Sequence, residues 1–589
     1  MKKLLLLLAF CSIFSLQAQI IPDAPWMQNF DTQNRESAYK FQDIVDAAEA
    51  YFETIDKDAK GSGYKPFKRW ENYWQNYVGA DGYLPTSLEL WNSYLEVEAR
   101  ANTRNTQVDE SNWISLGPTD FNNQSTSFAN IGRVNVIIRD PGNFNTYYAG
   151  APSGGIWKST DAGLTWTILN DNLPQIGVSG IAIDKNDSNV IYIATGDDDA
   201  GDTFSVGVWK SIDGGATWNT TGLQPGSTPS RMNDIYIHPT NSNILWVATN
   251  SGIFKTSDGG VTWSNNLVNN NVRDIKINPA NPDIVYIATS NRFYKSTDGG
   301  DSFFLSNSGL PTISGRFVID VTPANPNYVY LVSANTDNSY QGVYRSTDSG
   351  DSWVQMANTQ NIFESNQAWY DLALAVSDTD EDEIYVGVLN IWKSNNGGDS
   401  FTQVNQWNVR NQSYTHADIH FLRFYNGELF AGTDGGFFRS ADGGVNFTDL
   451  TVGMEITQFY RIDVSEQTSN KVAGGTQDNG SFAYFNSWNQ FLAVTADGME
   501  AVIDPNNDNI YYSFMQFGQV LTVSNTSGQG TSQGYGAPDT ANWITPLSVN
   551  SESEVYAGYS ALWRFNTDVT NWTQISQDFG TNIDGSSQG

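Results

Sequence analysis

One eight-residue pattern, Ser-x-Asp-x-Gly-x-x-Trp, recurs along this chain and restricts its fold more than any other feature. It is best preserved at residues 159–166, and each copy follows a short apolar stretch that ends in a basic residue and Ser or Thr. The third position of the seven copies is occupied by Asp161, Asp213, Asp258, Asp298, Asp348, Asn396 and Asp442. Neighbouring copies lie 40–52 residues apart, a period typical of four-stranded propeller blades.

Each conserved type in the pattern has a physical task in a turn between two strands. An Asp side chain accepts hydrogen bonds from backbone N–H groups of its own hairpin. Gly adopts a positive φ without steric cost, and Trp or Phe opens the next strand and fills the gap between blades. We therefore interpret the seven Asp and Asn positions as structural clips rather than ligand-binding groups.

The pattern resembles the Asp-box, or BNR, repeat of sialidases, sortilin-type receptors and the two-propeller xyloglucanases of glycoside hydrolase family 74. The resemblance covers about residues 113–447 and implies an all-β propeller, while leaving function open. Further blade starts follow at Tyr460, Ala501 and Leu547. We expect about ten four-stranded blades, seven in residues 113–450 and the rest in a truncated region, 451–589. They form either two seven-bladed rings, the second incomplete, or one ten-bladed ring.

Residues 113–116 (Trp-Ile-Ser-Leu) look like a fourth strand that has no first three strands before it. Such a strand usually completes a blade supplied by the far end of the chain, which hides the sheet edge. This favours two rings and a chain that is a fragment of a longer protein. The resemblance to exported Bacteroidetes-type repeat proteins implies that a C-terminal sorting domain for type IX secretion is missing.

The first 112 residues differ from the repeats. Lys2, Lys3, an apolar run to Leu16 and Ala18 predict a signal peptide at residues 1–18, hence a secreted or cell-surface protein. Cys11 follows Phe10, which disfavours a lipid anchor, and no later run is long enough to span a membrane. Apolar residues at helical spacing over 41–52, 70–77 and 88–95 predict a helical collar or pro-segment, and 101–111 reads as a linker.

The charge of the chain limits its partners. With 64 acidic against 31 basic residues, the net charge is −33, so nucleic acid and anionic membranes are excluded. The single Cys excludes a disulfide framework and a Cys-ligated zinc site. We expect a monomer that binds protein or carbohydrate.

The rim opposite the boxes carries the candidate site residues. His416, Asp418 and His420 alternate at the start of the seventh blade, so on a strand they would share one face. They could bind a metal through His416 and His420, or supply acid–base groups, or only line the channel with hydrogen-bonded side chains.

Turn-forming loops of adjacent blades add Asp434, Gln477, Asp478 and Asp497 to this candidate binding surface. Asp418, Asp434 and Asp478 are the catalytic candidates. No cofactor is expected, except that the acidic loop with Asp197 and Asp199 could hold calcium, a solvated loop being the alternative.

Two functions remain in competition. The first is an exported propeller that binds protein or glycan through its acidic rim. The alternative is a xyloglucanase-like glycoside hydrolase, which needs two suitably spaced carboxyl groups. Pro152 stands where the resemblance to family 74 places a catalytic Asp, and the arginine cluster of sialidases is absent from the sequence, so binding is favoured over catalysis.

Overall fold

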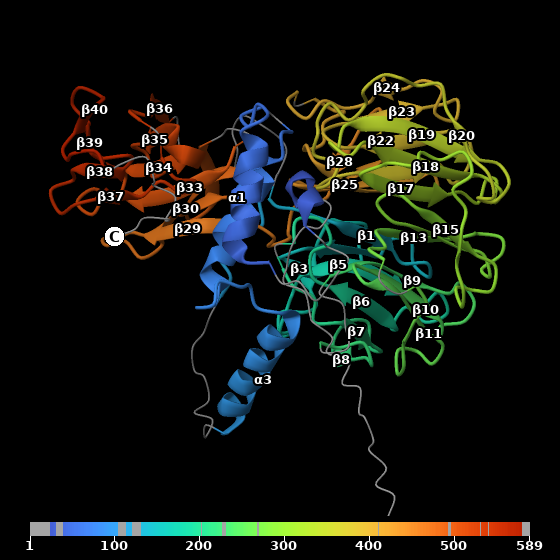
Figure 1. Ribbon diagram of the computed structural model, residues 1–589. Coiled ribbons are helices and arrows are strands. Elements are labelled where there is room, and N and C mark those ends of the chain that lie inside the picture. The colour runs from blue at the N-terminus through green and yellow to red at the C-terminus, as the bar shows by residue number, and fades with distance from the viewer. Residues whose placement is uncertain are drawn as a thin grey trace, which may run out of the picture.

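The computed structural model describes residues 24–30, 39–59, 61–103, 114–120, 131–201, 203–225, 231–267, 270–409, 411–492, 496–529, 532–539 and 541–579. Within these ranges the protein is all-β except for a small helical segment, as the sequence predicts (Figure 1). The predicted signal peptide, Trp113 and residues 580–589 lie outside the described residues.

Ten four-stranded antiparallel sheets make up the described β-structure, and in each sheet the strands are paired in chain order. These are the expected blades.

The strands of blades 1–4 are β1 (Val136–Arg139), β2 (Tyr147–Ala151), β3 (Gly155–Ser159), β4 (Thr167–Ile168), β5 (Val178–Ile183), β6 (Ile191–Thr195), β7 (Val208–Ser211), β8 (Asn219–Thr220), β9 (Met232–Ile237), β10 (Leu245–Thr249), β11 (Gly252–Thr256), β12 (Ser264–Asn265), β13 (Asp274–Ile277), β14 (Val285–Ala288), β15 (Phe293–Ser296) and β16 (Phe304–Leu305). Those of blades 5–7 are β17 (Arg316–Val321), β18 (Val329–Ala334), β19 (Tyr340–Ser346), β20 (Val354–Gln355), β21 (Ala373–Val376), β22 (Ile384–Gly387), β23 (Ile391–Ser394), β24 (Thr402–Gln403), β25 (Ile419–Tyr425), β26 (Glu428–Thr433), β27 (Gly436–Ser440) and β28 (Thr448–Asp449). Those of blades 8–10 are β29 (Phe459–Val464), β30 (Lys471–Thr476), β31 (Gly480–Phe485), β32 (Trp488–Leu492), β33 (Gly498–Ile503), β34 (Tyr511–Met515), β35 (Val520–Ser524), β36 (Gln533–Gly536), β37 (Leu547–Val549), β38 (Val555–Gly558), β39 (Leu562–Asn566) and β40 (Asn571–Gln574).

The first seven blades close into a ring. Their first strands lie side by side in sequence order, and β25 and β26 of blade 7 contact β1 of blade 1. Blades 8–10 form a separate row in which β29 contacts β33 and β33 contacts β37. Figure 1 shows the two groups as distinct lobes. The alternative of one ten-bladed ring is therefore wrong, and we call the groups ring 1 and lobe 2.

The burial of the strands explains their composition. The second strands, such as β6, β10 and β14, are buried along their whole length because blades cover both faces. These strands accordingly read as continuous apolar runs. The fourth strands of ring 1 are only two residues long and largely exposed, which places them at its outer edge.

The box turns have the geometry that their sequence predicts. In blade 1, Asp161 Oδ1 accepts the backbone N–H of Thr165 at 2.9 Å, and Asp161 Oδ2 accepts its hydroxyl at 2.7 Å. The Ser159 hydroxyl accepts the N–H of Gly163 at 2.8 Å. The indole of Trp166 donates to the carbonyl of Leu450 in blade 7 at 2.8 Å, so the aromatic residue joins neighbouring blades.

The helical segment contains η1 (Pro25–Asn29), α1 (Phe41–Phe52), α2 (Tyr64–Trp74), η2 (Gln75–Tyr77) and α3 (Ser87–Thr103), and a further short turn, η3 (Gln516–Gly518), lies in lobe 2. Figure 1 places α1 between the two lobes, while α3 extends away from them. The helices were expected, but α3 reaches into the predicted linker. None of the described helices combines the length and hydropathy needed to cross a membrane.

Residues 114–116 do not behave as the fourth strand that we expected. No strand is assigned to them, and the carbonyl of Leu116 instead accepts a hydrogen bond from the indole of Trp488 in β32. The segment thus lies beside blade 8 rather than completing a later blade. A main-chain bond from Gly453 to Thr119 at 2.8 Å fixes it against the connection between the lobes.

Candidate functional site

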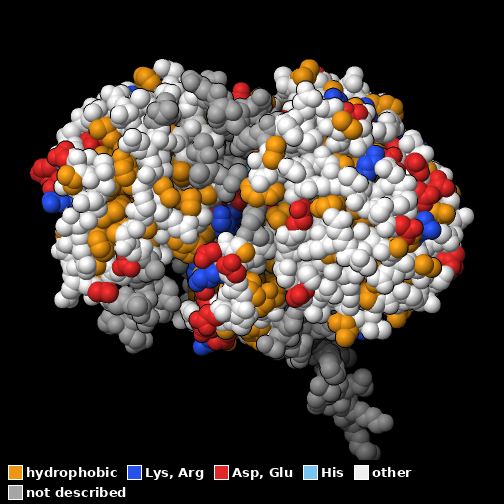
Figure 2. Space-filling model, turned by 90° about the horizontal axis from the view of Figure 1, so that it is seen from above, with side chains coloured by type: hydrophobic (Ala, Val, Ile, Leu, Met, Phe, Trp, Pro, Cys, Tyr) orange, Lys and Arg blue, Asp and Glu red, His pale blue; other side chains and the backbone are white. Residues whose placement is uncertain are grey.

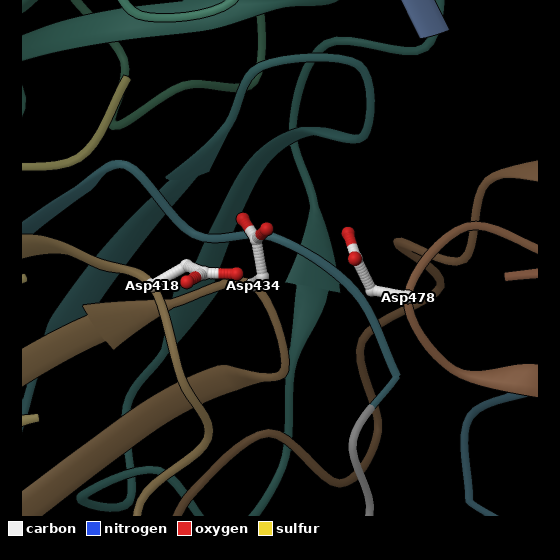
Figure 3. A group of neighbouring side chains, drawn as sticks. All are labelled: Asp418, Asp434 and Asp478. Carbon is white, nitrogen blue, oxygen red and sulfur yellow. The ribbon is translucent and has the colours of Figure 1, made fainter. Parts of the chain in front are cut away.

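Three carboxylates from both lobes converge where ring 1 meets lobe 2. Asp418 precedes β25, Asp434 follows β26, and Asp478 lies between β30 and β31. One oxygen from each side chain lies within 4.8 Å of the other two. Figure 3 shows Asp418 and Asp434 on one side of this cluster and Asp478 on the other. We call these three residues the carboxylate cluster.

Backbone geometry around the cluster is unusual. Asp418 and Asp478 have φ values of 63° and 59°, in the left-handed region that few residues other than glycine adopt. Asp434 is held by the closure of ring 1, because Val134 donates its N–H to Thr433 and Ile131 donates to Gly435, both at 3.1 Å. Strained backbone of this kind gathers at functional sites.

His420 connects the cluster to the acidic loop of blade 2. Its Nδ1 lies 2.7 Å from Asp199 and its Nε2 lies 2.9 Å from Asp434. Burial by itself lowers the pKa of His420, but the hydrogen bonds to the two carboxylates outweigh it and raise the pKa to about 10. The same imidazolium overcomes burial to lower the pKa of Asp434. Near neutral pH the three groups therefore form a buried ionic chain.

The loop with Asp197 and Asp199 is buried, so the expectation of a solvated loop is wrong. Arg133 donates to Asp197 at 2.8 Å, and Arg316 donates to Asp199 at 3.2 Å. Arg133 and Arg316 thus contact the oxygens that we considered as calcium ligands, and calcium at this loop stays a prediction.

A buried carboxyl group, that of Asp371, lies behind the cluster. Gln367 Nε2 donates to Asp418 at 2.6 Å and to Asp371 at 3.0 Å. Burial, followed by the negative charge of Asp418, raises the pKa of Asp371 well above its usual value. Asp371 is fully buried, and its Oδ1 has no hydrogen-bond partner among the described residues.

Helix α2 supplies a cation to the cluster. The Arg69 guanidinium bonds to Asp478 and to both oxygens of Asp497, the latter at 3.0 Å. Its second terminal nitrogen lies 4.0 Å from Asp434. Asp497 also accepts the backbone N–H of Asp478 at 3.0 Å, which holds the strained turn in place.

A cavity of about 240 Å³ opens beside the cluster. Ring 1 contributes Gln367, Trp407, His416 and Asp418, lobe 2 contributes Asp478 and Gln516, and the helical segment contributes residues 57–59, 61–66 and 69. Seen from above, the two lobes meet along a central groove in which basic and acidic side chains lie next to each other (Figure 2). The cavity is large enough for one sugar ring.

The structure brings most of the predicted residues together but not in the predicted way. Strand β25 begins only at Ile419 and has a register shift between Ile419 and Phe421, so His416 and Asp418 are not on a strand face with His420. The shared-face prediction is therefore wrong. A metal bound by both histidines is unsupported, because both ring nitrogens of His420 contact carboxylates. Gln477 is buried but does not line the cavity.

Several residues of the site were missed by the sequence reasoning: Arg69, Arg133, Arg316, Gln367, Tyr370 and Asp371. Tyr370 donates its hydroxyl to Asp434 at 2.8 Å. One signal was available, since Arg133, Arg231, Arg273 and Arg316 recur at or just before the first strands of four blades. Arg69 gave no such signal, because Lys65 and Lys68 stand beside it in the same helix and nothing in the sequence distinguishes it from them.

Fold and repeats define this chain as an Asp-box β-propeller protein with a two-lobed arrangement. The sequence model of the sortilin family (Sortilin-Vps10; sortilin, neurotensin receptor 3) matches residues 251–388. Two curated xyloglucanases are similar over short stretches. One from Hypocrea jecorina is 29% identical over 133 residues, which are 20% of this chain and 16% of the relative. One from a Paenibacillus species is 30% identical over 111 residues, 15% of this chain and 10% of the relative.

Solved structures extend the similarity of fold. The GH74 enzyme of Niastella koreensis superposes with a TM-score of 0.58 and 18% identity, covering 76% of this chain and 73% of that one. The GH74 xyloglucanase of Xanthomonas campestris gives 0.59 and 13%, covering 77% and 75%. These structures share the propeller fold with this chain, while the curated relatives are matched over less than a fifth of their own length.

Proposed function

We propose that this protein binds a carbohydrate in the cavity beside the carboxylate cluster and hydrolyses a glycosidic bond there. The observation that carries the proposal is the convergence of Asp418 and Asp478, from different lobes, on one sugar-sized cavity. Glycoside hydrolysis needs two carboxyl groups that flank the scissile bond. The xyloglucanase relatives make xyloglucan the first substrate to test.

The two carboxylates are the candidates for the acid and for the base or nucleophile. Asp434 is less suited, because His420 and Tyr370 already bond to it and it does not line the cavity. One oxygen of Asp418 lies within 4.8 Å of one oxygen of Asp478, so the two side chains are close enough to act on one glycosidic bond. We therefore propose that Asp418 and Asp478 together carry out the reaction.

Binding without turnover is the second candidate function. Two observations favour it: Arg69 is ion-paired with Asp478, and the loop between β2 and β3 presents Pro152 where family 74 resemblance places a carboxylate. A protein that only binds glycan would need the cavity but not two free carboxyl groups.

One experiment separates these functions. Mature protein is incubated with a panel of polysaccharides, and released reducing sugar and retained glycan are both measured. Hydrolysis is supported if Asp418→Asn and Asp478→Asn each abolish turnover while Asp171→Asn leaves it unchanged. Asp171 serves as the control because it is an exposed acid outside the cavity lining. Capture without released sugar supports binding alone. The proposal is overturned if neither the wild type nor Arg69→Met, which removes the ion pair to Asp478, captures any glycan or releases any sugar.

A further inference from the structure

Helices α1 and α2 fill the space between ring 1 and lobe 2. Trp26, next to α1, makes an edge contact with Trp369 of ring 1 at a centroid distance of 5.2 Å. Tyr64 of α2 stacks on Phe517 of lobe 2 at 5.8 Å and 10°. The indole of Trp74 donates to the carbonyl of Gly201 at 2.9 Å. The helical segment is thus attached to both lobes at once, and we call the described residues 24–30, 39–59 and 61–77 the helical plug.

The plug carries one buried cation, and that cation meets the carboxylates. The Arg69 side chain is only 6% exposed, and its guanidinium reaches Asp478 and Asp497 of lobe 2 while approaching Asp434 of ring 1. Three carboxylates from two lobes therefore share one guanidinium. An external ligand that needed Asp478 would have to compete with this ion pair.

The remaining plug contacts are side-chain packing, including a hydrophobic core shared with Ala200, Trp369 and Tyr370 of ring 1. Within the described residues, no strand of either lobe pairs with the plug. The one backbone–backbone hydrogen bond described between them runs from Asn366 to Gly61, at 3.2 Å. Side-chain packing and the Arg69 ion pairs hold the plug, so its departure breaks no β-ladder.

We infer that the helical plug is an intramolecular inhibitor, in which Arg69 occupies the carboxylate cluster as a built-in ligand. The cavity then accepts an external ligand only after α2 has moved away. The identity of that ligand as a glycan rests on the proposed function, whereas the plug itself rests on the contacts above.

Hydrogen–deuterium exchange tests the plug without any ligand. In Arg69→Met, which keeps the aliphatic stem but loses the charge, α2 amides should exchange at least about tenfold faster, because Asp478 and Asp497 lose the guanidinium, while the Lys65 ammonium of α2 stays 3.9 Å from Asp497. The strands of ring 1 should keep their rates. Arg139→Met is the matched control, since Arg139 pairs with Glu428 on ring 1 away from the plug. Unchanged α2 exchange in Arg69→Met overturns the inference.

A second variant protects the test against misfolding. Arg69→Lys keeps a positive charge but lacks the planar fork that reaches both oxygens of Asp497, so its α2 exchange should lie between wild type and Arg69→Met. If Arg69→Met does not fold, α2 exchange in Arg69→Lys as slow as in wild type overturns the inference.

The glycan assay separates this inference from the proposed function. Faster α2 exchange together with increased capture or release of sugar by Arg69→Met supports both. Faster α2 exchange in Arg69→Met without any change in glycan capture or release supports the plug inference and contradicts the proposed glycan function. A third outcome is that the wild type turns over glycan, Arg69→Met does not increase this turnover, and the α2 amides stay protected during it. This outcome supports the proposed function and overturns the inference that the plug is an inhibitor.

Discussion

The aspartates on the two rims of ring 1 are held in place by different kinds of hydrogen bonds. On the box rim, Asp161 and its equivalents are bonded to groups within four residues along the chain. On the opposite rim, Asp434 is bonded to His420 and Tyr370, and His420 in turn to Asp199, 221 residues away. The aspartates of the box rim are exposed and make the same short-range hydrogen bonds in each blade. Those of the opposite rim are buried, and their bonds form one network between residues far apart in the sequence.

This difference indicates at which aspartates the loss of a charge or counter-ion should change the free energy of unfolding most. An exposed turn carboxylate keeps its water and gains a few local hydrogen bonds. A buried carboxylate has lost its water and depends on each counter-ion. Substitutions on the two rims should therefore differ greatly in their effect on stability, although the residue type is the same.

The largest effect is expected at His420. His420→Ala leaves Asp199 and Asp434 buried without the imidazolium between them, so the free energy of unfolding should fall by about 3–5 kcal/mol. Urea unfolding followed by tryptophan fluorescence measures it. A loss below about 1 kcal/mol would show that the two rims are energetically alike.

Alkaline pH should reproduce part of that loss. Because the folded pKa of His420 is raised from 6.5 to about 10, its contribution is complete below pH 6.5 and disappears as the pH rises through about 10. The unfolding free energy should therefore decrease between pH 7 and pH 10.5. His420→Gln, which does not titrate, should show a shallower decrease over the same interval, and equal slopes would contradict the assignment.

A smaller effect should reveal the backbone strain at Asp478. Asp478→Gly and Asp478→Ala remove the same carboxylate, but only the Ala variant has a Cβ atom that is sterically strained at a φ of 59°. The Gly variant should be more stable by about 1 kcal/mol. Thermal unfolding of the two variants side by side is sufficient, and equal stability would mean that the left-handed turn relaxes.

The smallest effect is expected on the box rim. Asn396 already replaces Asp in blade 6, where its Oδ1 accepts the N–H of Ser400 at 3.1 Å. Asp258→Asn should therefore fold normally at pH 7, with a Tm within about 2 °C of wild type. A larger drop in Tm at pH 7 would show that the negative charge itself matters in this turn.

Acid should affect the box rim instead. Hydrogen bonds from the Thr262 hydroxyl and N–H lower the pKa of Asp258 to about 2, so its contribution is present above pH 3.8 and is lost as the pH falls towards 2. Circular dichroism between pH 4 and pH 2 should show slightly less acid sensitivity in Asp258→Asn than in wild type.

The same contrast explains what sequence could predict. All seven box turns and the start of each later blade were readable because their determinants lie within one hairpin. Asp434, Asp478 and Asp497 were found because turn signals gathered on neighbouring blades, and His420 was found because it alternates with His416 and Asp418 in the sequence. Arg69 was not, because its partners lie 409 and 428 residues further along the chain and only the docking of α2 brings them together.

The closure of ring 1 has a further consequence for the carboxylate cluster. Among the described residues no strand crosses from blade 7 to blade 1, and main-chain bonds from Ile131 and Val134 end on Gly435 and Thr433, the two neighbours of Asp434. The bonds that close the circle thus also hold the backbone on either side of Asp434. An opening of the circle at this point would displace Asp434 before it broke any β-ladder.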